Sequence, residues 1–178
     1  MIWRYVDLGL LWPLMAVAAL GLTIAWFATR RRRSARARAM PLVLLATTVV
    51  GILILTLGPV GATPFGPSGA WNLVPLRTIS YATSTGSGGV VLLQIVGNVV
   101  MFVPLGLLLW LMTRKVVLTL LAAAALSLLI ETAQLGIGRS SDVDDVILNV
   151  FGTLLGVFLA RGVRTVFLGM ERRPIGRT

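Results

Sequence analysis

The stretch SLLIETAQLGIGRSSDVDD, residues 127–145, and the stretch VILNVFGTLLGV directly after it, residues 146–157, decide how the chain is organised. Of the six acidic residues in the whole chain, four lie in the first stretch: Glu131, Asp142, Asp144 and Asp145. Glu131 sits inside an apolar segment, where a carboxylate is energetically costly, and the aspartates stand at the start of the next one. These residues are therefore the first candidates for a site.

The composition indicates a membrane protein. Hydrophobic residues make up 57% of the 178 residues, and charged residues only 12%, which is outside the range of ordinary soluble domains. The net charge is +10, but the arginines gather at the ends of apolar runs. That placement is a membrane-orientation signal and not a nucleic-acid-binding stripe, so we expect no nucleic-acid partner.

The chain contains no cysteine and no histidine. Thiolate nucleophiles, Ser-His dyads, imidazole acid–base chemistry and Cys or His zinc sites are therefore excluded. Any chemistry must use carboxylates, hydroxyls, amides or arginines. No cofactor is certain, and a divalent cation held by oxygen ligands is a possible one.

Apolar runs predict an all-α integral membrane bundle that forms a single domain over residues 1–178. A run of about 20 apolar residues is long enough to cross a bilayer. About five transmembrane helices are expected, at residues 8–29, 41–60, 90–112, 116–135 and 146–168. Pro41 suits the first helical position of the second span.

The basic residues predict the orientation. With the N-terminus outside and the C-terminus in the cytoplasm, only Arg4, Arg77 and Arg139 of the sixteen basic residues face outward. This agrees with the positive-inside rule at every loop. We therefore expect a multi-pass protein of the cell membrane.

This orientation brings polar residues from separate segments to the outer end. The long connection at residues 61–89 is rich in Gly, Pro, Ser and Thr and contains WNLVPLR, residues 71–77, a composition typical of the membrane interface. Helical spacing places Ser127, Glu131 and Gln134 on one face, and Asn98 and Phe102 on another. A face of the last span carries Asp145, Asn149, Gly152 and Gly156, and its two glycines permit close helix contact.

Four segments together resemble the VanZ-like family of teicoplanin-resistance-type integral membrane proteins: WNLVPL, GNVVMFVPLG, ETAQ and RSSDVDDVILNVFGTLLG. The resemblance covers about residues 71–159, and Leu76 departs from the aromatic residue more usual there. It implies a cell-envelope role linked to glycopeptide resistance and implies no particular reaction. The matching positions are Asn72, Pro75, Asn98, Phe102, Pro104, Leu105, Gly106, Glu131, Gln134, Arg139, Asp142, Asp144, Asp145, Asn149 and Gly152.

Each candidate site residue has a functional and a structural interpretation. Glu131 and Gln134 could contact a ligand, bind a metal or transfer a proton, or they could lock the helices through a pair with Arg139 or Arg77. The aspartates could hold a divalent cation or a headgroup, or cap the last helix, with Ser141 and Asp144 at capping-box spacing. Asn98 and Asn149 are expected to form interhelical hydrogen bonds, with contact to a ligand as the alternative. Arg77 and Arg139 could each bind a phosphate or carboxylate through two hydrogen bonds, or each could pair with one of these acids. The candidate ligand-binding set is Asn72, Arg77, Asn98, Glu131, Gln134, Arg139, Asp142, Asp144, Asp145 and Asn149.

Three functions remain open. The first is an envelope protein whose outward-facing polar pocket binds a lipid-linked envelope precursor or a glycopeptide. The second is an enzyme that acts on a lipid through carboxylates and a divalent metal, with Glu131, Asp142 and Asp145 as the metal ligands. The third is a non-catalytic scaffold for another membrane protein. Membrane lipid is a partner in all three, and catalytic residues and oligomeric state stay undetermined.

Overall fold

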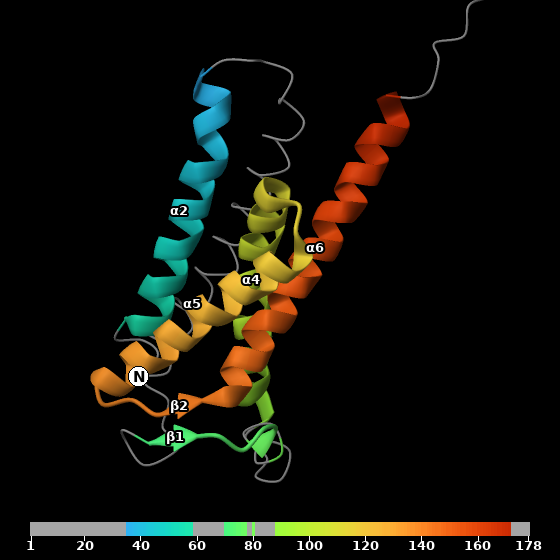
Figure 1. The fold of residues 1–178 in the computed structure, drawn as a ribbon. Coiled ribbons are helices and arrows are strands. Elements are labelled where there is room, and N and C mark those ends of the chain that lie inside the picture. The colour runs from blue at the N-terminus through green and yellow to red at the C-terminus, as the bar shows by residue number, and fades with distance from the viewer. Residues whose placement is uncertain (1–34, 59–69, 78–79, 81–87, 172–178) are drawn as a thin grey trace, which may run out of the picture.

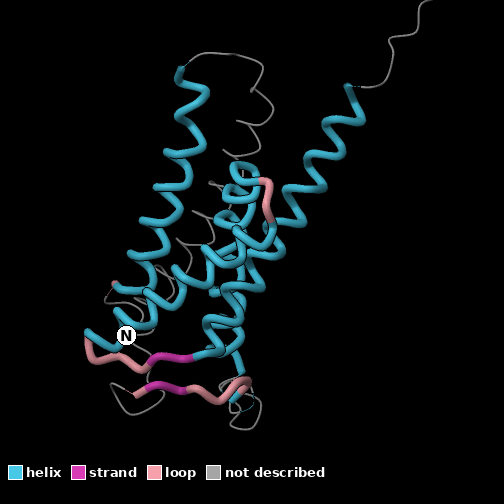
Figure 2. Tube along the Cα trace, in the orientation of Figure 1, coloured by secondary structure: helices cyan, strands magenta, loops and turns pink. Residues whose placement is uncertain are grey.

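The described part of the chain folds into long helices and a short strand pair (Figures 1 and 2). The computed structural model describes residues 35–58, 70–77, 80 and 88–171, and the first expected span, 8–29, lies outside them. In chain order the elements are α2 (Ala35–Leu57), β1 (Trp71–Asn72), α4 (Gly88–Thr113), α5 (Val116–Gly136), β2 (Ser141–Asp142) and α6 (Val143–Glu171).

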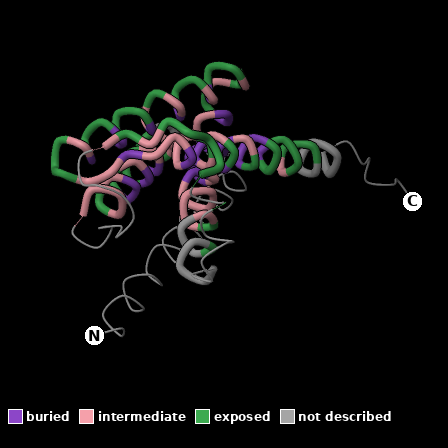
Figure 3. The backbone as a smooth tube through the Cα atoms, turned by 90° about the horizontal axis from the view of Figure 1, so that it is seen from below, coloured by how far each residue is buried: buried purple, intermediate pink, exposed green. Residues whose placement is uncertain are grey.

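Among the described residues, four helices are long and apolar enough to cross a membrane: Met40–Leu57, Ile95–Thr113, Val116–Gly136 and Val143–Thr165. They correspond to four of the expected spans. Figure 3 shows that exposed residues follow one another along much of these helices. Large apolar side chains are among the exposed ones, for example Leu129 at 68% and Ile54 at 64% exposure. Apolar side chains on an outer surface are what a lipid environment requires, so the chain is a helical membrane protein.

The start of α2 differs from the prediction for Pro41. The helix begins at Ala35, so Pro41 lies inside it and not at its first position. The residues ahead of the proline read ARARAM, and Ala, Arg and Met are strong helix formers. These six residues extend the helix on the N-terminal side of Pro41, because the proline removes only one backbone hydrogen bond.

Helices α4 and α6 form the tightest contact in the bundle. A Cβ atom added at Gly152 of α6 would lie 2.1 Å from the carbonyl oxygen of Val99 in α4, and one at Gly106 of α4 would lie 2.1 Å from that of Thr153. A Cβ at Gly156 would meet the α4 backbone just as closely. The prediction that Gly152 and Gly156 form a close-packing face is therefore confirmed.

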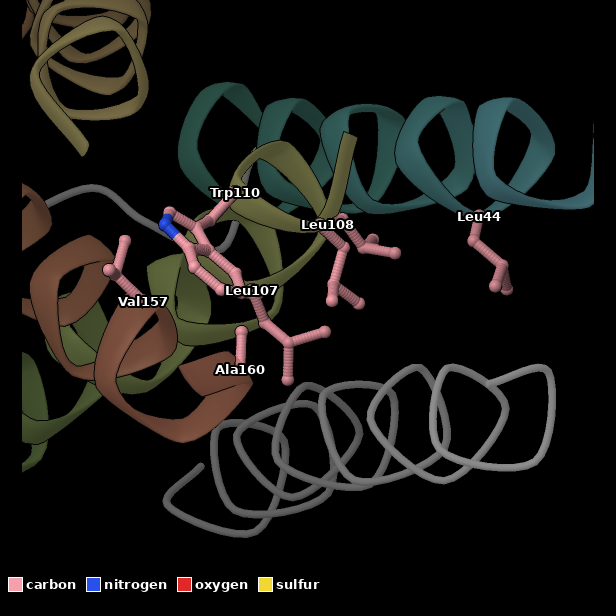
Figure 4. Close-up of a cluster of buried hydrophobic side chains, with 7 residues drawn as sticks. Leu44, Leu107, Leu108, Trp110, Val157 and Ala160 are labelled. Atoms are coloured by element: carbon pink, nitrogen blue, oxygen red, sulfur yellow. The ribbon is translucent and has the colours of Figure 1, made fainter. Parts of the chain in front are cut away.

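The core lies around α4, between α2, α5 and α6. One buried cluster joins α2, α4 and α6, with Trp110 and Leu108 at its centre (Figure 4). A second cluster joins α2, α4 and α5 around Phe102, which is fully buried, so Phe102 faces the bundle as its spacing with Asn98 predicts. The two clusters consist of Leu44, Leu107, Leu108, Trp110, Leu111, Val157 and Ala160, and of Ile52, Phe102, Leu105, Ala123 and Ile130.

Candidate functional site

The strand pair crosses the end of the bundle where α5 ends and α6 begins (Figures 1 and 2). Strands β1 and β2 run parallel, with Trp71 beside Ser141 and Asn72 beside Asp142. The backbone N–H of Ser141 also donates to the carbonyl of Ala70 at 3.1 Å. Residues 70–77, which we call the strap, are thereby fixed to the loop between α5 and α6. The sequence predicted a loop segment here, and the strand pairing was missed.

Glu131 ties this loop to the last turns of α5. Its side chain is 2% exposed, and its Oε2 atom accepts hydrogen bonds from the Ser141 hydroxyl at 2.7 Å and from the Asp142 backbone N–H at 2.9 Å. Two donors offset much of the cost of burying a carboxylate. Ser141 is fully buried. The capping-box interpretation for Ser141 is wrong, because its hydroxyl is directed to Glu131.

Asp142 takes the capping position instead. Its Oδ1 atom accepts from the backbone N–H of Asp144 at 2.9 Å, at the first turn of α6. This is how an N-cap side chain satisfies one of the open N–H groups of a helix. The same Oδ1 atom accepts from the Asn72 amide at 3.1 Å. One carboxylate therefore begins α6 and holds the strap.

Asp144 and Asp145 reach other segments. The Oδ1 atom of Asp144, a residue that is 2% exposed, accepts from the backbone N–H of Leu76 at 2.5 Å. Asp145 Oδ1 accepts from the side-chain amide of Asn98, which joins α6 to α4. Capping thus explains one aspartate, and the other two fasten neighbouring segments.

Leu76 has an unusual backbone. Its φ angle is 64°, in the left-handed region that favours glycine and costs other residues roughly 1–2 kcal/mol. The Asn72 side-chain oxygen accepts from the Val74 N–H at 3.4 Å, which shapes the turn before it. A conformation of this kind persists where the surroundings enforce it, and such outliers gather at functional sites.

Gln134 and Arg139 bind α2 to the same end of the bundle. Gln134 Nε2 and Arg139 Nη1 both donate to the carbonyl oxygen of Thr56, at 3.1 Å and 2.6 Å. Thr56 lies in the last turn of α2, where carbonyls have no partner within the helix. Burial lowers the pKa of the Arg139 guanidinium from its ordinary value, and the negative charges of Glu131 and Asp145 oppose this shift.

Asn149 lies deeper between the helices. Its amide Nδ2 donates to the Ser127 hydroxyl at 2.9 Å and joins α6 to α5. The prediction that Asn98 and Asn149 form interhelical hydrogen bonds is confirmed by this bond and by the bond from Asn98 to Asp145. The Asn149 Oδ1 atom is buried without a hydrogen-bond partner among the described residues.

Arg77 stands apart from the other candidates. Its side chain is exposed and makes no hydrogen bond or ion pair with any described residue. Apolar side chains of the strap are exposed beside it, with Trp71 at 44% and Leu73 at 69%. The strap therefore presents an apolar surface and a guanidinium outward, while its inner side is fastened to the carboxylates.

The possible metal ligands are not assembled. Within residues 35–58, 70–77, 80 and 88–171, no group of three or more Asp and Glu side chains could hold a metal ion. Glu131, Asp142 and Asp145 accept hydrogen bonds from different segments instead. The described arrangement uses its carboxylates as acceptors that join one end of the bundle.

Comparison with known proteins gives one match. A family model described as VanZ/LLP1 matches residues 42–167, a range that contains the whole region of motif resemblance. A search among curated proteins gave no match, and neither did a search among solved structures.

Proposed function

The chain belongs to the VanZ/LLP1 family, and on this premise we propose that it binds a polar or lipid-linked molecule of the cell envelope at the outer face of the cell membrane. The binding site is the end of the bundle that carries the strap. The proposed topology has five spans, with residues 8–29 as the first, an outer N-terminus and a cytoplasmic C-terminus.

Charge supports the outer placement of this end. At this end, Arg77 is the last residue of the strap and Arg139 lies in the loop after α5. The opposite end of the bundle carries Arg114 and Lys115 between α4 and α5, and the C-terminal part of α6 carries Arg161 and Arg164. By the positive-inside rule, these basic residues support a cytoplasmic position for the opposite end.

The observation that carries the proposal is the fastening of the strap. Side chains from four separate parts of the chain converge at this end. Asp142 and Asp144 hold the strap, Asp145 holds Asn98 of α4, and Arg139 holds the carbonyl of Thr56 in α2. Intramembrane ionisable residues are expensive and mark functional sites by default. Here they build a rigid frame whose outward surface is free to meet a ligand.

The carboxylate and metal enzyme is the weaker candidate. It needs several carboxylates around one ion, whereas the three candidate ligands Glu131, Asp142 and Asp145 accept hydrogen bonds from donors in different segments. The scaffold alternative accounts for the hydrogen-bonded frame but gives no role to the exposed Arg77. Ligand binding accounts for both.

Gene deletion and complementation test the proposed function. We expect deletion to change the teicoplanin sensitivity or the envelope composition of the host, and the wild-type gene to restore it. The Arg77→Gln variant should restore less than the Arg164→Gln variant, which removes an equal charge from an exposed position on α6. An unchanged phenotype on deletion would remove the main support for an envelope role.

A further inference from the structure

We propose that the strap, residues 70–77, is the recognition element of the site and that its ligand is a lipid with a phosphate headgroup. This inference rests on the proposed function and names the ligand class for the same site. The carboxylates and amides behind the strap position it, and they do not contact the ligand.

The strap is held too firmly to be an ordinary connection. Its start is fixed by the backbone bond from Ser141 to Ala70, its middle by the Asn72 and Asp142 side chains, and its end by the bond from Leu76 to Asp144. Connecting segments usually lack such anchors and tolerate variation. A segment of eight residues with three anchors, to Ser141 and Asp142 of β2 and to Asp144 at the start of α6, is instead preorganised, which lowers the entropy cost of binding.

The backbone at Leu76 adds an independent observation. A left-handed conformation at φ 64° is costly for leucine, and Asp144 holds the residue there by accepting its N–H. The conformation leaves the Leu76 side chain 58% exposed, directly before Arg77. Strain of this kind at an exposed apolar residue is not explained by packing, and it points to a surface kept for a ligand.

The outward surface of the strap is apolar. Trp71, Leu73, Val74 and Leu76 are exposed at 44%, 69%, 56% and 58%. Asn72 turns inward between Trp71 and Leu73, as the alternation of a strand requires. Because the strap crosses the ends of membrane-spanning helices, these side chains lie at the level where a lipid chain meets its headgroup.

Arg77 gives the surface its charge selectivity. Its guanidinium is exposed and makes no bond to a described residue, and it directly follows the apolar side chains in the sequence. A guanidinium can bind a phosphate through two parallel hydrogen bonds. Because both groups are charged, these hydrogen bonds are stronger than those between neutral groups. An apolar ridge next to a single guanidinium fits a molecule that carries both parts, a hydrocarbon chain and a phosphate.

A binding experiment with the full chain in phosphatidylcholine nanodiscs tests this inference. The probes are a polyprenyl monophosphate, the polyprenol of the same chain length and inorganic phosphate, and native mass spectrometry measures the bound fraction. We expect the phosphate lipid to bind at least tenfold more tightly than the alcohol. Inorganic phosphate should not displace it, because phosphate lacks the apolar part.

Three variants assign the selectivity. The Arg77→Gln variant should reduce the preference for the phosphate lipid over the alcohol at least tenfold, and the Arg164→Gln variant should leave it unchanged. Leu73→Ser should weaken the binding of both lipids equally. The melting temperatures of all variants serve as a folding control, since the three side chains are exposed.

Several results would overturn the inference. Equal affinity for the phosphate lipid and the alcohol would show that charge plays no part, and equal losses in Arg77→Gln and Arg164→Gln would show a general charge effect. Displacement by inorganic phosphate would indicate an anion site without lipid, and displacement by a similar amount of phosphatidylglycerol would indicate ordinary contact with the bilayer.

If the wild type restores teicoplanin tolerance yet binds no phosphate lipid, the proposed function stands and this inference fails. If deletion has no envelope phenotype, the proposed function itself fails.

Discussion

The backbone N–H of Leu76 donates to the carboxylate of Asp144 at 2.5 Å, across a separation of 68 residues. This bond joins a strained residue at the end of the strap to a buried acid at the start of α6. It explains why an acidic side chain is kept almost fully buried there: the carboxylate holds a backbone that leucine alone would not favour.

Replacing Leu76 with glycine tests the strain at this bond. Glycine adopts φ 64° without steric cost, so the substitution removes about 1–2 kcal/mol of backbone strain from the folded state. Glycine also loses more conformational entropy on folding, which costs roughly 0.5–1 kcal/mol, so the relieved strain offsets this cost. We expect the free energy of unfolding of Leu76→Gly to equal or exceed that of the wild type. Leu73→Gly, at a residue without positive φ, should lower it. Equal destabilisation by both would contradict the account of Leu76.

Removing the Asp144 carboxylate should loosen the strap. In Asp144→Ala the Leu76 N–H loses its acceptor, and we expect its hydrogen exchange to become at least tenfold faster. The overall cost should be modest, about 1 kcal/mol, since water can reach the strap. Hydrogen-exchange mass spectrometry of residues 70–77 measures the change. Asp144→Asn retains an acceptor oxygen and should show a smaller effect, and unchanged exchange in Asp144→Ala would show that the bond does not hold the strap.

Glycine at position 152 is required by the contact of α6 with α4. A Cβ there meets the Val99 carbonyl, a backbone atom that cannot turn aside, so Gly152→Ala should destabilise the protein by about 3 kcal/mol. Gly162 of the same helix has no atom within 4 Å of such a Cβ. Gly162→Ala should therefore stabilise by about 0.5–1 kcal/mol. Thermal unfolding in one detergent measures both, and similar effects would refute the close approach.

Glu131 and Ser141 should be energetically coupled. A double-mutant cycle with Glu131→Ala and Ser141→Ala isolates their pairwise term, which we expect to be about 1–2 kcal/mol. Glu131→Gln alone should cost less than Glu131→Ala, because the amide oxygen still accepts from the Asp142 N–H. Additive effects of the two substitutions would show that the hydroxyl contributes nothing to holding the carboxylate.

The helices could be predicted from the sequence, and the details of the site only in part. Runs of apolar residues located α4 and α5 nearly to the residue, and spacing identified the interhelical roles of Asn98 and Asn149. The close-packing face of α6 followed from its glycines. These features depend on local composition and helical period, which a single sequence contains.

The connections that build the site could not be predicted in the same way. Strands of two residues are too short to carry an alternating pattern, so the pairing of β1 with β2 left no signal. Arg139 donates a hydrogen bond to the backbone carbonyl of Thr56, and a sequence does not show which backbone carbonyls lack a donor within their own helix. Positive φ is expected at glycine or asparagine and not at Leu76. The spacing of Ser141 and Asp144 permits a capping box, but spacing alone does not show that the Ser141 hydroxyl donates to Glu131.

The central claim is tested most directly by measuring on which side of the membrane the strap lies. The chain has no cysteine, so single cysteines can be placed at Leu73 on the strap and at Thr165 near the other end of α6, both exposed. Intact cells are treated with a membrane-impermeant maleimide. We predict that Leu73→Cys is labelled in intact cells and that Thr165→Cys is labelled only after the cells are opened. Labelling of Thr165→Cys in intact cells, with Leu73→Cys protected until the cells are opened, would place the site in the cytoplasm and contradict its role at the outer envelope.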